Sequence, residues 1–65
     1  MNEHGFYTRL GIALKRIGWP IETRRNLKRA VRRCATLLAD GEEVTVSHHR
    51  LALGLIIGQP TEVAG

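Results

Sequence analysis

The segment from Pro20 to about Ala39 separates apolar and basic side chains onto opposite sides of a helix, and this pattern constrains the fold most strongly. Its apolar residues recur at helical spacing on one arc: Leu27, Ala30, Val31, Cys34, Leu37 and Leu38. Its cations form a double row on the opposite arc, in pairs that recur every four residues: Arg24, Arg25, Lys28, Arg29, Arg32 and Arg33. The sequence therefore predicts a helix over residues 20–40 that packs on one side and exposes a basic surface on the other.

A first amphipathic helix is predicted over residues 5–18. Its apolar residues fall on one side of a helical wheel: Phe6, Tyr7, Leu10, Ala13, Leu14 and Ile17. Gly18 is placed to end this helix, and Trp19 and Pro20 form the turn, with Pro20 acceptable as the first residue of the next helix.

A third helix is predicted over residues 47–58, after a stop at Asp40-Gly41 and a short extended connector at residues 44–46. Ser47 is its expected cap, and residues 58–60, Gly-Gln-Pro, are its expected end. Apolar side chains surround this helix instead of forming a stripe, so it must be buried on several sides. Two short amphipathic helices cover only one of those sides, and a second copy of the chain is the simplest cover for the rest. The predicted dimer interface consists of Ile12, Leu51, Leu53, Leu55, Ile56 and Ile57.

The length of 65 residues limits the chain to a single small helical domain, 1–65, with frayed ends near 1–4 and 60–65. The predicted fold class is therefore all-α, with three short helices in a small homodimeric bundle. A chain of this size has little room for an enclosed active site, and no positioned acid and base pair or glycine-rich phosphate loop is present. We expect no enzymatic activity and no cofactor.

Charge is distributed unevenly along the chain. Residues 1–33 contain nine of the ten Lys and Arg residues and two acids, whereas residues 34–65 contain one Arg and four acids. Clustered charge of one sign is typical of an interaction surface. The basic double row permits three interpretations: nucleic-acid binding, docking onto an acidic protein, or a solvated face without a specific partner. Guanidinium groups favour the first, because they pair bidentately with phosphate and with guanine edges.

The eleven residues from Thr23 to Arg33 resemble the arginine-rich helices with which lambdoid phage antitermination proteins bind an RNA hairpin. Those peptides are disordered until bound and largely polar all round, whereas Leu27 and Val31 give this helix an apolar face. The resemblance implies nucleic-acid binding and assigns no family. A helix-turn-helix or a ribbon-helix-helix does not fit the order of the predicted elements.

The remaining residues with chemical potential have structural interpretations. Cys34 lies within the apolar arc and is expected to behave as a buried small hydrophobe. His48 and His49 are adjacent, so on a helix they point about 100° apart and cannot hold one ion together. We predict no metal site. Trp19 either closes the corner between the first two helices or serves as a stacking or docking anchor.

The longest apolar stretch, residues 51–57, is much shorter than the roughly 20 residues that span a bilayer, and residues 1–5 have no signal-like pattern. We therefore expect a cytoplasmic protein with no stable membrane association, which binds anionic vesicles only weakly through surface charge. The main hypothesis is a small non-enzymatic regulator that binds DNA or structured RNA through the basic double row, extended by Lys15 and Arg16. The alternative is an inhibitor or adaptor, of the kind that phages and plasmids encode, which docks its basic helix on an acidic surface of a host protein.

Overall fold

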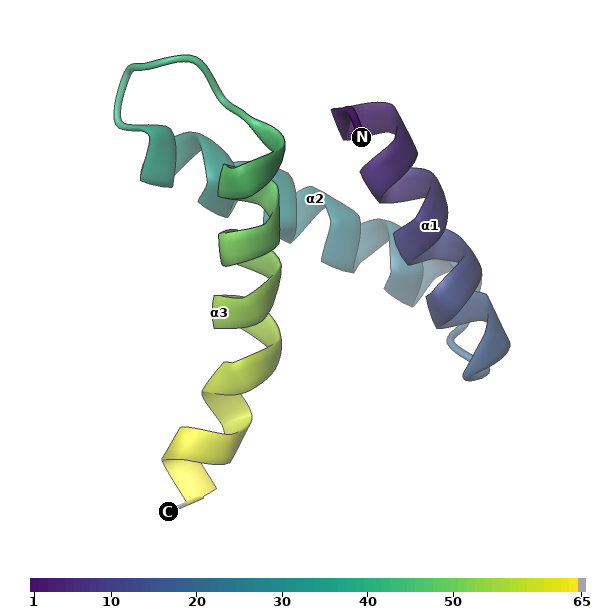
Figure 1. Cartoon of the computed structure of the whole chain (residues 1–65). Coiled ribbons are helices and arrows are strands. Elements are labelled where there is room, and N and C mark those ends of the chain that lie inside the picture. Colours follow the sequence, from purple (N-terminus) through teal and green to yellow (C-terminus); the bar gives the residue numbers. More distant parts are fainter. Residues whose placement is uncertain (65) are drawn as a thin grey trace.

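The computed structural model of the chain describes the backbone of residues 1–64 and the side chains of residues 1–58. Within this part, the chain forms three helices and no strands: α1 (Glu3–Arg16), α2 (Ile21–Ala39) and α3 (Val46–Ala64). The prediction of an all-α chain with three helices is confirmed. Figure 1 shows that α1 and α3 both lie in front of α2 and diverge from each other toward their C-terminal ends.

Helix α1 begins two residues earlier than predicted because Asn2 caps it. The Asn2 side-chain oxygen accepts a hydrogen bond of 2.8 Å from the backbone N–H of Gly5, and Asn2 itself has an extended backbone. This contact satisfies one of the free donors in the first turn. His4, expected near a frayed end, therefore lies in the first turn of the helix.

The turn after α1 is a Schellman motif, which ends the helix at Arg16 instead of residue 18. The N–H of Gly18 donates to the carbonyl of Lys15 at 3.1 Å, and the N–H of Trp19 donates to the carbonyl of Leu14 at 3.0 Å. Gly18 has φ 89°, a left-handed conformation that favours glycine. The motif brings Trp19 back toward the apolar side of α1.

Helix α2 is bounded by residues of the expected kind. Pro20 lies just outside the helix in an extended conformation and is not its first residue, so α2 starts at Ile21. At the other end, Asp40 and Gly41 adopt left-handed conformations with φ 49° and 87°. The predicted stop at these two residues is confirmed.

Helix α3 starts at Val46, directly after Thr45, so the expected cap at Ser47 is wrong. The Thr45 N–H donates to Nδ1 of His48 at 2.9 Å, and the His48 N–H donates to the Thr45 carbonyl at 3.0 Å. The His48 side chain thus reaches back to the N–H of Thr45, as the Glu or Gln of a capping box does.

At its other end, α3 extends to Ala64, past the predicted end at residue 58. The predicted end at residues 58–60 is therefore wrong, and Pro60 lies within α3 although it has no N–H to donate. The predicted fraying of residues 60–65 falls on side chains outside the described part and stays a prediction.

The core lies where α2 meets the first turns of α3 and the inner face of α1. Its buried apolar residues come from all three helices: Phe6, Tyr7, Leu14, Leu27, Val31, Ala35 and Ala52.

The apolar arc of α2 differs from the prediction. Ala35 and Ala39 are buried, whereas Ala30 and Leu38 are exposed and Leu37 is 79% exposed. Alanines let another backbone approach closely, and α3 crosses α2 on this side, so the leucines are left on the outside.

Candidate nucleic-acid interface

The six cations of α2 do not form one uniform surface. Their i, i+4 spacing places them in two parallel rows, and the structure gives these rows different environments. We name Arg24, Lys28 and Arg32 the seam row, because these side chains contact α1 or the turn after it. We name Arg25, Arg29 and Arg33 the outer row, because all three are exposed on the uncovered side of α2.

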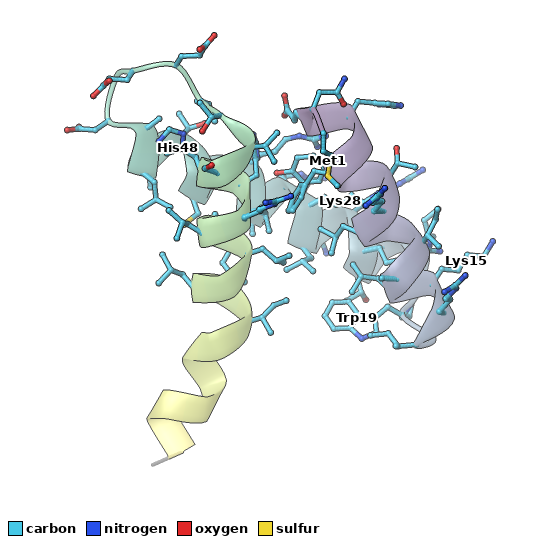
Figure 2. The ribbon with its side chains drawn as sticks, viewed as in Figure 1. Met1, Lys15, Trp19, Lys28 and His48 are labelled. Atoms are coloured by element: carbon cyan, nitrogen blue, oxygen red, sulfur yellow. The ribbon has the colours of Figure 1, made fainter. Side chains whose placement is uncertain are left out.

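The first two members of the seam row are half-buried against the end and the middle of α1. The Arg24 Nε donates to the backbone carbonyl of Trp19 at 3.1 Å. The Lys28 ammonium lies so close to Gly11 that a Cβ at that position would be 2.7 Å from Nζ. Figure 2 shows Lys28 alongside α1. Gly11 thus makes room for a lysine between the helices, and both cations have a structural role.

Arg32 completes the seam row near the start of α1. Its guanidinium carbon lies 4.2 Å from the centre of the Tyr7 ring, within the range of a cation–π contact. Its Nε lies 3.6 Å from Oε1 of Glu3, and both side chains are more than half exposed. An ion pair this exposed adds little stability, so the ring contact is the stronger constraint on Arg32.

Behind Arg32, a buried hydrogen bond joins α1 to α3. The Tyr7 hydroxyl lies 2.7 Å from Nδ1 of His49, and these residues are 4% and 3% exposed. His49 Nε2 lies 3.7 Å from Oε1 of Glu3. A carboxylate on that side favours the tautomer with the proton on Nε2, so the Tyr7 hydroxyl donates to Nδ1.

Burial raises the pKa of Tyr7, the nearby charge of Arg32 opposes this shift, and Glu3 adds to it. Tyr7 is therefore a neutral donor at physiological pH. A carboxylate, a histidine and a hydroxyl in line resemble a nucleophilic triad, but the hydroxyl and the ring are closed off from any substrate. The arrangement joins α1 to α3, and the contact of Arg32 with the Tyr7 ring adds α2.

Sequence reasoning missed this cluster. Glu3 and Tyr7 are four residues apart and so share a face of α1, which was a readable signal. Nothing local identifies His49 as their partner, because it lies on another helix.

The outer row has a different character. Within the described residues, Arg25, Arg29 and Arg33 form no ion pair or side-chain hydrogen bond, and all three face away from the core. Successive members are four residues apart, so the row extends for roughly 12 Å along the helix axis. Three guanidinium groups in line, on a helix with one uncovered side, are free to contact anions.

Lys15 and Arg16 belong to the last turn of α1, where both are exposed. Figure 2 shows Lys15 at the end of α1 with its side chain directed away from the helices. Cations in a last helical turn favour the negative end of the helix dipole. Both charges therefore also stabilise the C-terminal end of α1.

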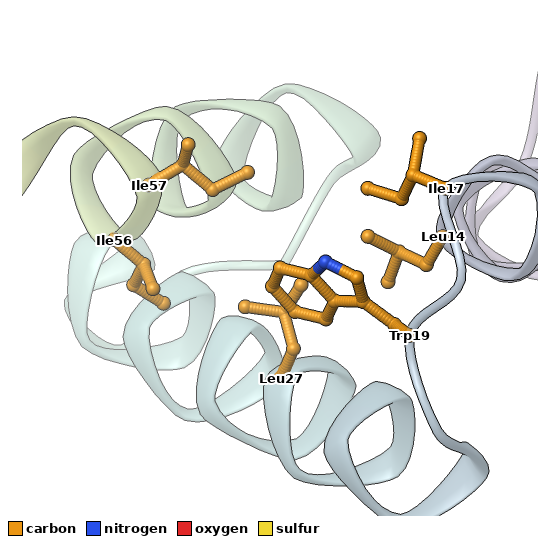
Figure 3. A pocket seen from close by; sticks show the side chains of 6 residues that line it. All are labelled: Leu14, Ile17, Trp19, Leu27, Ile56 and Ile57. Carbon is orange, nitrogen blue, oxygen red and sulfur yellow. The ribbon is translucent and has the colours of Figure 1, made fainter.

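An apolar pocket of about 370 Å³ opens between the diverging helices α1 and α3. Figure 3 shows two of its walls, Leu14 and Ile17 on one side and Ile56 and Ile57 on the other, with Trp19 and Leu27 between them. Trp19 thus packs partly against the core and also lines an open apolar surface.

The predicted interface residues divide into two groups in this structure. Leu53 and Ile56 pack partly against the core, whereas four others remain exposed: Ile12, Leu51, Leu55 and Ile57. Cys34 is a free thiol that packs against the core and is only half-buried.

Among the described residues, no three His, Cys, Asp or Glu side chains are grouped so that they could hold a metal ion. None of the helices, as far as they are described, combines the length and the hydropathy needed to cross a bilayer. Comparison of the chain with protein-family models, with curated protein sequences and with solved structures gives no match.

Proposed function

We propose that this protein is a small non-enzymatic regulator that binds nucleic acid through the outer row of α2 and acts as a homodimer. The observation that supports binding is the outer row itself: three exposed arginines at four-residue spacing, on the side of α2 that neither α1 nor α3 covers. Arginine pairs with phosphate oxygens in a planar, bidentate geometry.

The two rows have different proposed roles. Arg24, Lys28 and Arg32 already contact α1 or its turn, so a phosphate would compete with those contacts. The outer row has no such competitor among the described residues. If each outer arginine neutralises one phosphate of duplex DNA, log affinity falls with log salt at a slope of about −2.7 per chain. Use of all six cations would give a slope of about −5 per chain.

The experiment is a titration of mixed duplex DNA and of structured RNA at several salt concentrations, followed by gel shift or fluorescence anisotropy. The test variant replaces Arg25, Arg29 and Arg33 with glutamine, which preserves helix propensity. Its matched control is Arg50→Gln, an exposed arginine on α3. We expect the triple variant to lose binding while the control keeps the wild-type slope. Wild-type affinity and salt slope in the triple variant would contradict the proposal.

Docking on an acidic protein is the competing function, and the apolar pocket beside Trp19 favours it as a site for a hydrophobic anchor. Affinity capture from bacterial lysate with and without nuclease separates the two functions. A stoichiometric protein partner that survives nuclease favours docking, and a partner lost after nuclease favours nucleic acid.

A further inference from the structure

We infer that the apolar pocket between α1 and α3, here called the groove, binds α3 of a second copy of this chain. Each of the two protomers would insert its α3 into the groove of the other. This inference rests on the proposed homodimer and specifies its surface. It is independent of what the outer row binds.

The first argument is the amount of exposed surface. A compact monomer of 7.3 kDa is expected to expose about 4,200 Å², and this chain exposes 5007 Å². The excess of about 800 Å² equals the area that each partner buries in a standard protein interface. The radius of gyration agrees, at 12.2 Å against about 11 Å for a compact domain of this length.

The second argument is the chemistry of the groove. All six side chains that line it are apolar, and they come from α1, the turn after it, α2 and α3. A small-molecule site usually has a few polar groups that orient its ligand. Apart from the indole N–H of Trp19, this surface has no such group, so it fits another apolar surface, and α3 is the most apolar element of this chain.

The third argument is that the groove has two walls and α3 has two exposed apolar faces. Leu51 and Leu55 are one turn apart and share a face, whereas Ile57 lies about 200° from Leu55 on the helix. Both faces are exposed in the single chain. A second α3 in the groove would place its Leu51 and Leu55 against the α1 wall and its Ile57 against the α3 wall.

Two-fold symmetry makes this arrangement closed. Each chain provides one groove and one α3, so the same contacts form twice and no groove is left open. The outer row lies on the other side of α2 from Leu27, which lines the groove, so the outer-row arginines of two chains of net charge +4 do not oppose each other there. This mutual insertion would bury α3, whose apolar residues lie on all sides of the helix.

The test compares two exposed leucines in the absence of nucleic acid. Leu55→Glu places a charge on the predicted contact face, at a position 54% exposed in the single chain, so the monomer fold tolerates it. Leu37→Glu is the matched control, because Leu37 is exposed on α2 and does not line the groove. Sedimentation equilibrium at micromolar concentration gives the mass, and circular dichroism verifies that each variant remains helical.

We expect twice the 7.3 kDa chain mass for the wild type and for Leu37→Glu, and the single mass for Leu55→Glu. Trp19, the only tryptophan, reports on the groove directly. Its emission should shift to shorter wavelength as wild-type concentration rises and stay constant in Leu55→Glu. A monomeric wild type, a dimeric Leu55→Glu variant, or dissociation by both substitutions would overturn the inference. A dimeric wild type that does not bind nucleic acid would instead refute the proposed nucleic-acid binding and leave this inference intact.

Discussion

The hydrogen bond between Tyr7 and His49 offers the most sensitive test of how the helices are held together. Tyr7→Phe deletes one hydroxyl and keeps the ring, so two neighbouring contacts survive. These are the edge-to-face contact with Phe6, at a centroid separation of 5.0 Å, and the position of Arg32 above the ring at 4.2 Å. The substitution leaves Nδ1 of His49 buried without its 2.7 Å partner.

An unpaired polar atom in the interior costs about 1 to 3 kcal/mol. A 65-residue domain has a total stability of about 3 to 10 kcal/mol, so this single oxygen accounts for a large share. If His49 is also replaced by leucine, no polar group remains unpaired. The double variant should therefore be less destabilised than the sum of the two single variants.

The assay is urea unfolding monitored by circular dichroism, at one fixed protein concentration because the stability of the proposed dimer would depend on concentration. Thr36→Val is the control: the Thr36 hydroxyl donates to the Arg32 carbonyl at 3.0 Å, but on the exposed surface. We expect it to change stability by less than about 0.5 kcal/mol. If Tyr7→Phe were equally mild, the buried bond would not fasten α1 to α3.

Four further predictions concern stability. Because burial raises the pKa of Tyr7, the folded chain retains a proton that the unfolded chain releases. Stability should therefore be full below about pH 10 and fall above it, with a smaller fall in Tyr7→Phe during alkaline unfolding. Gly54 has open space around its Cβ position, so Gly54→Ala should raise the free energy of unfolding by about 0.5 to 1 kcal/mol. Gly18→Ala should lower it by about 1 to 2 kcal/mol because φ is 89°. Val31→Ala removes two methyl groups at a position with no exposed surface, and thermal or urea unfolding should show a loss of about 2 to 3 kcal/mol.

Helix existence was predictable from the sequence because it depends on local spacing and on turn residues. Asp40-Gly41 and Gly18 stop helices through backbone conformations that can be anticipated from residue type. The starts were less predictable, because Asn2 and Thr45 act through contacts with residues three positions later. Any asparagine, threonine or serine near an expected start can make such a capping contact, so apolar spacing alone does not identify the residue that caps the helix.

The orientation of α2 was not predictable, because it depends on how close another helix can approach. On a helical wheel of α2, the arc that contains Leu37 and Leu38 is as apolar as the neighbouring arcs. The structure nevertheless buries Ala35 and Ala39 and leaves both leucines exposed. A large side chain favours burial by its area, but two helix backbones come together most closely at small residues. Which effect prevails depends on the position of α3, and residue-by-residue hydropathy does not contain that position.

The division of the basic helix into two rows follows from the same packing. α1 can lie along Arg24, Lys28 and Arg32 because Gly11 leaves space for an ammonium and because Tyr7 offers its ring to a guanidinium. The buried bond to His49 then fixes Tyr7 in place. The contacts that stabilise the fold thus select which cations remain available. For this reason a substitution in the seam row should lower the free energy of unfolding in urea, whereas one in the outer row should weaken nucleic-acid binding and leave stability nearly unchanged.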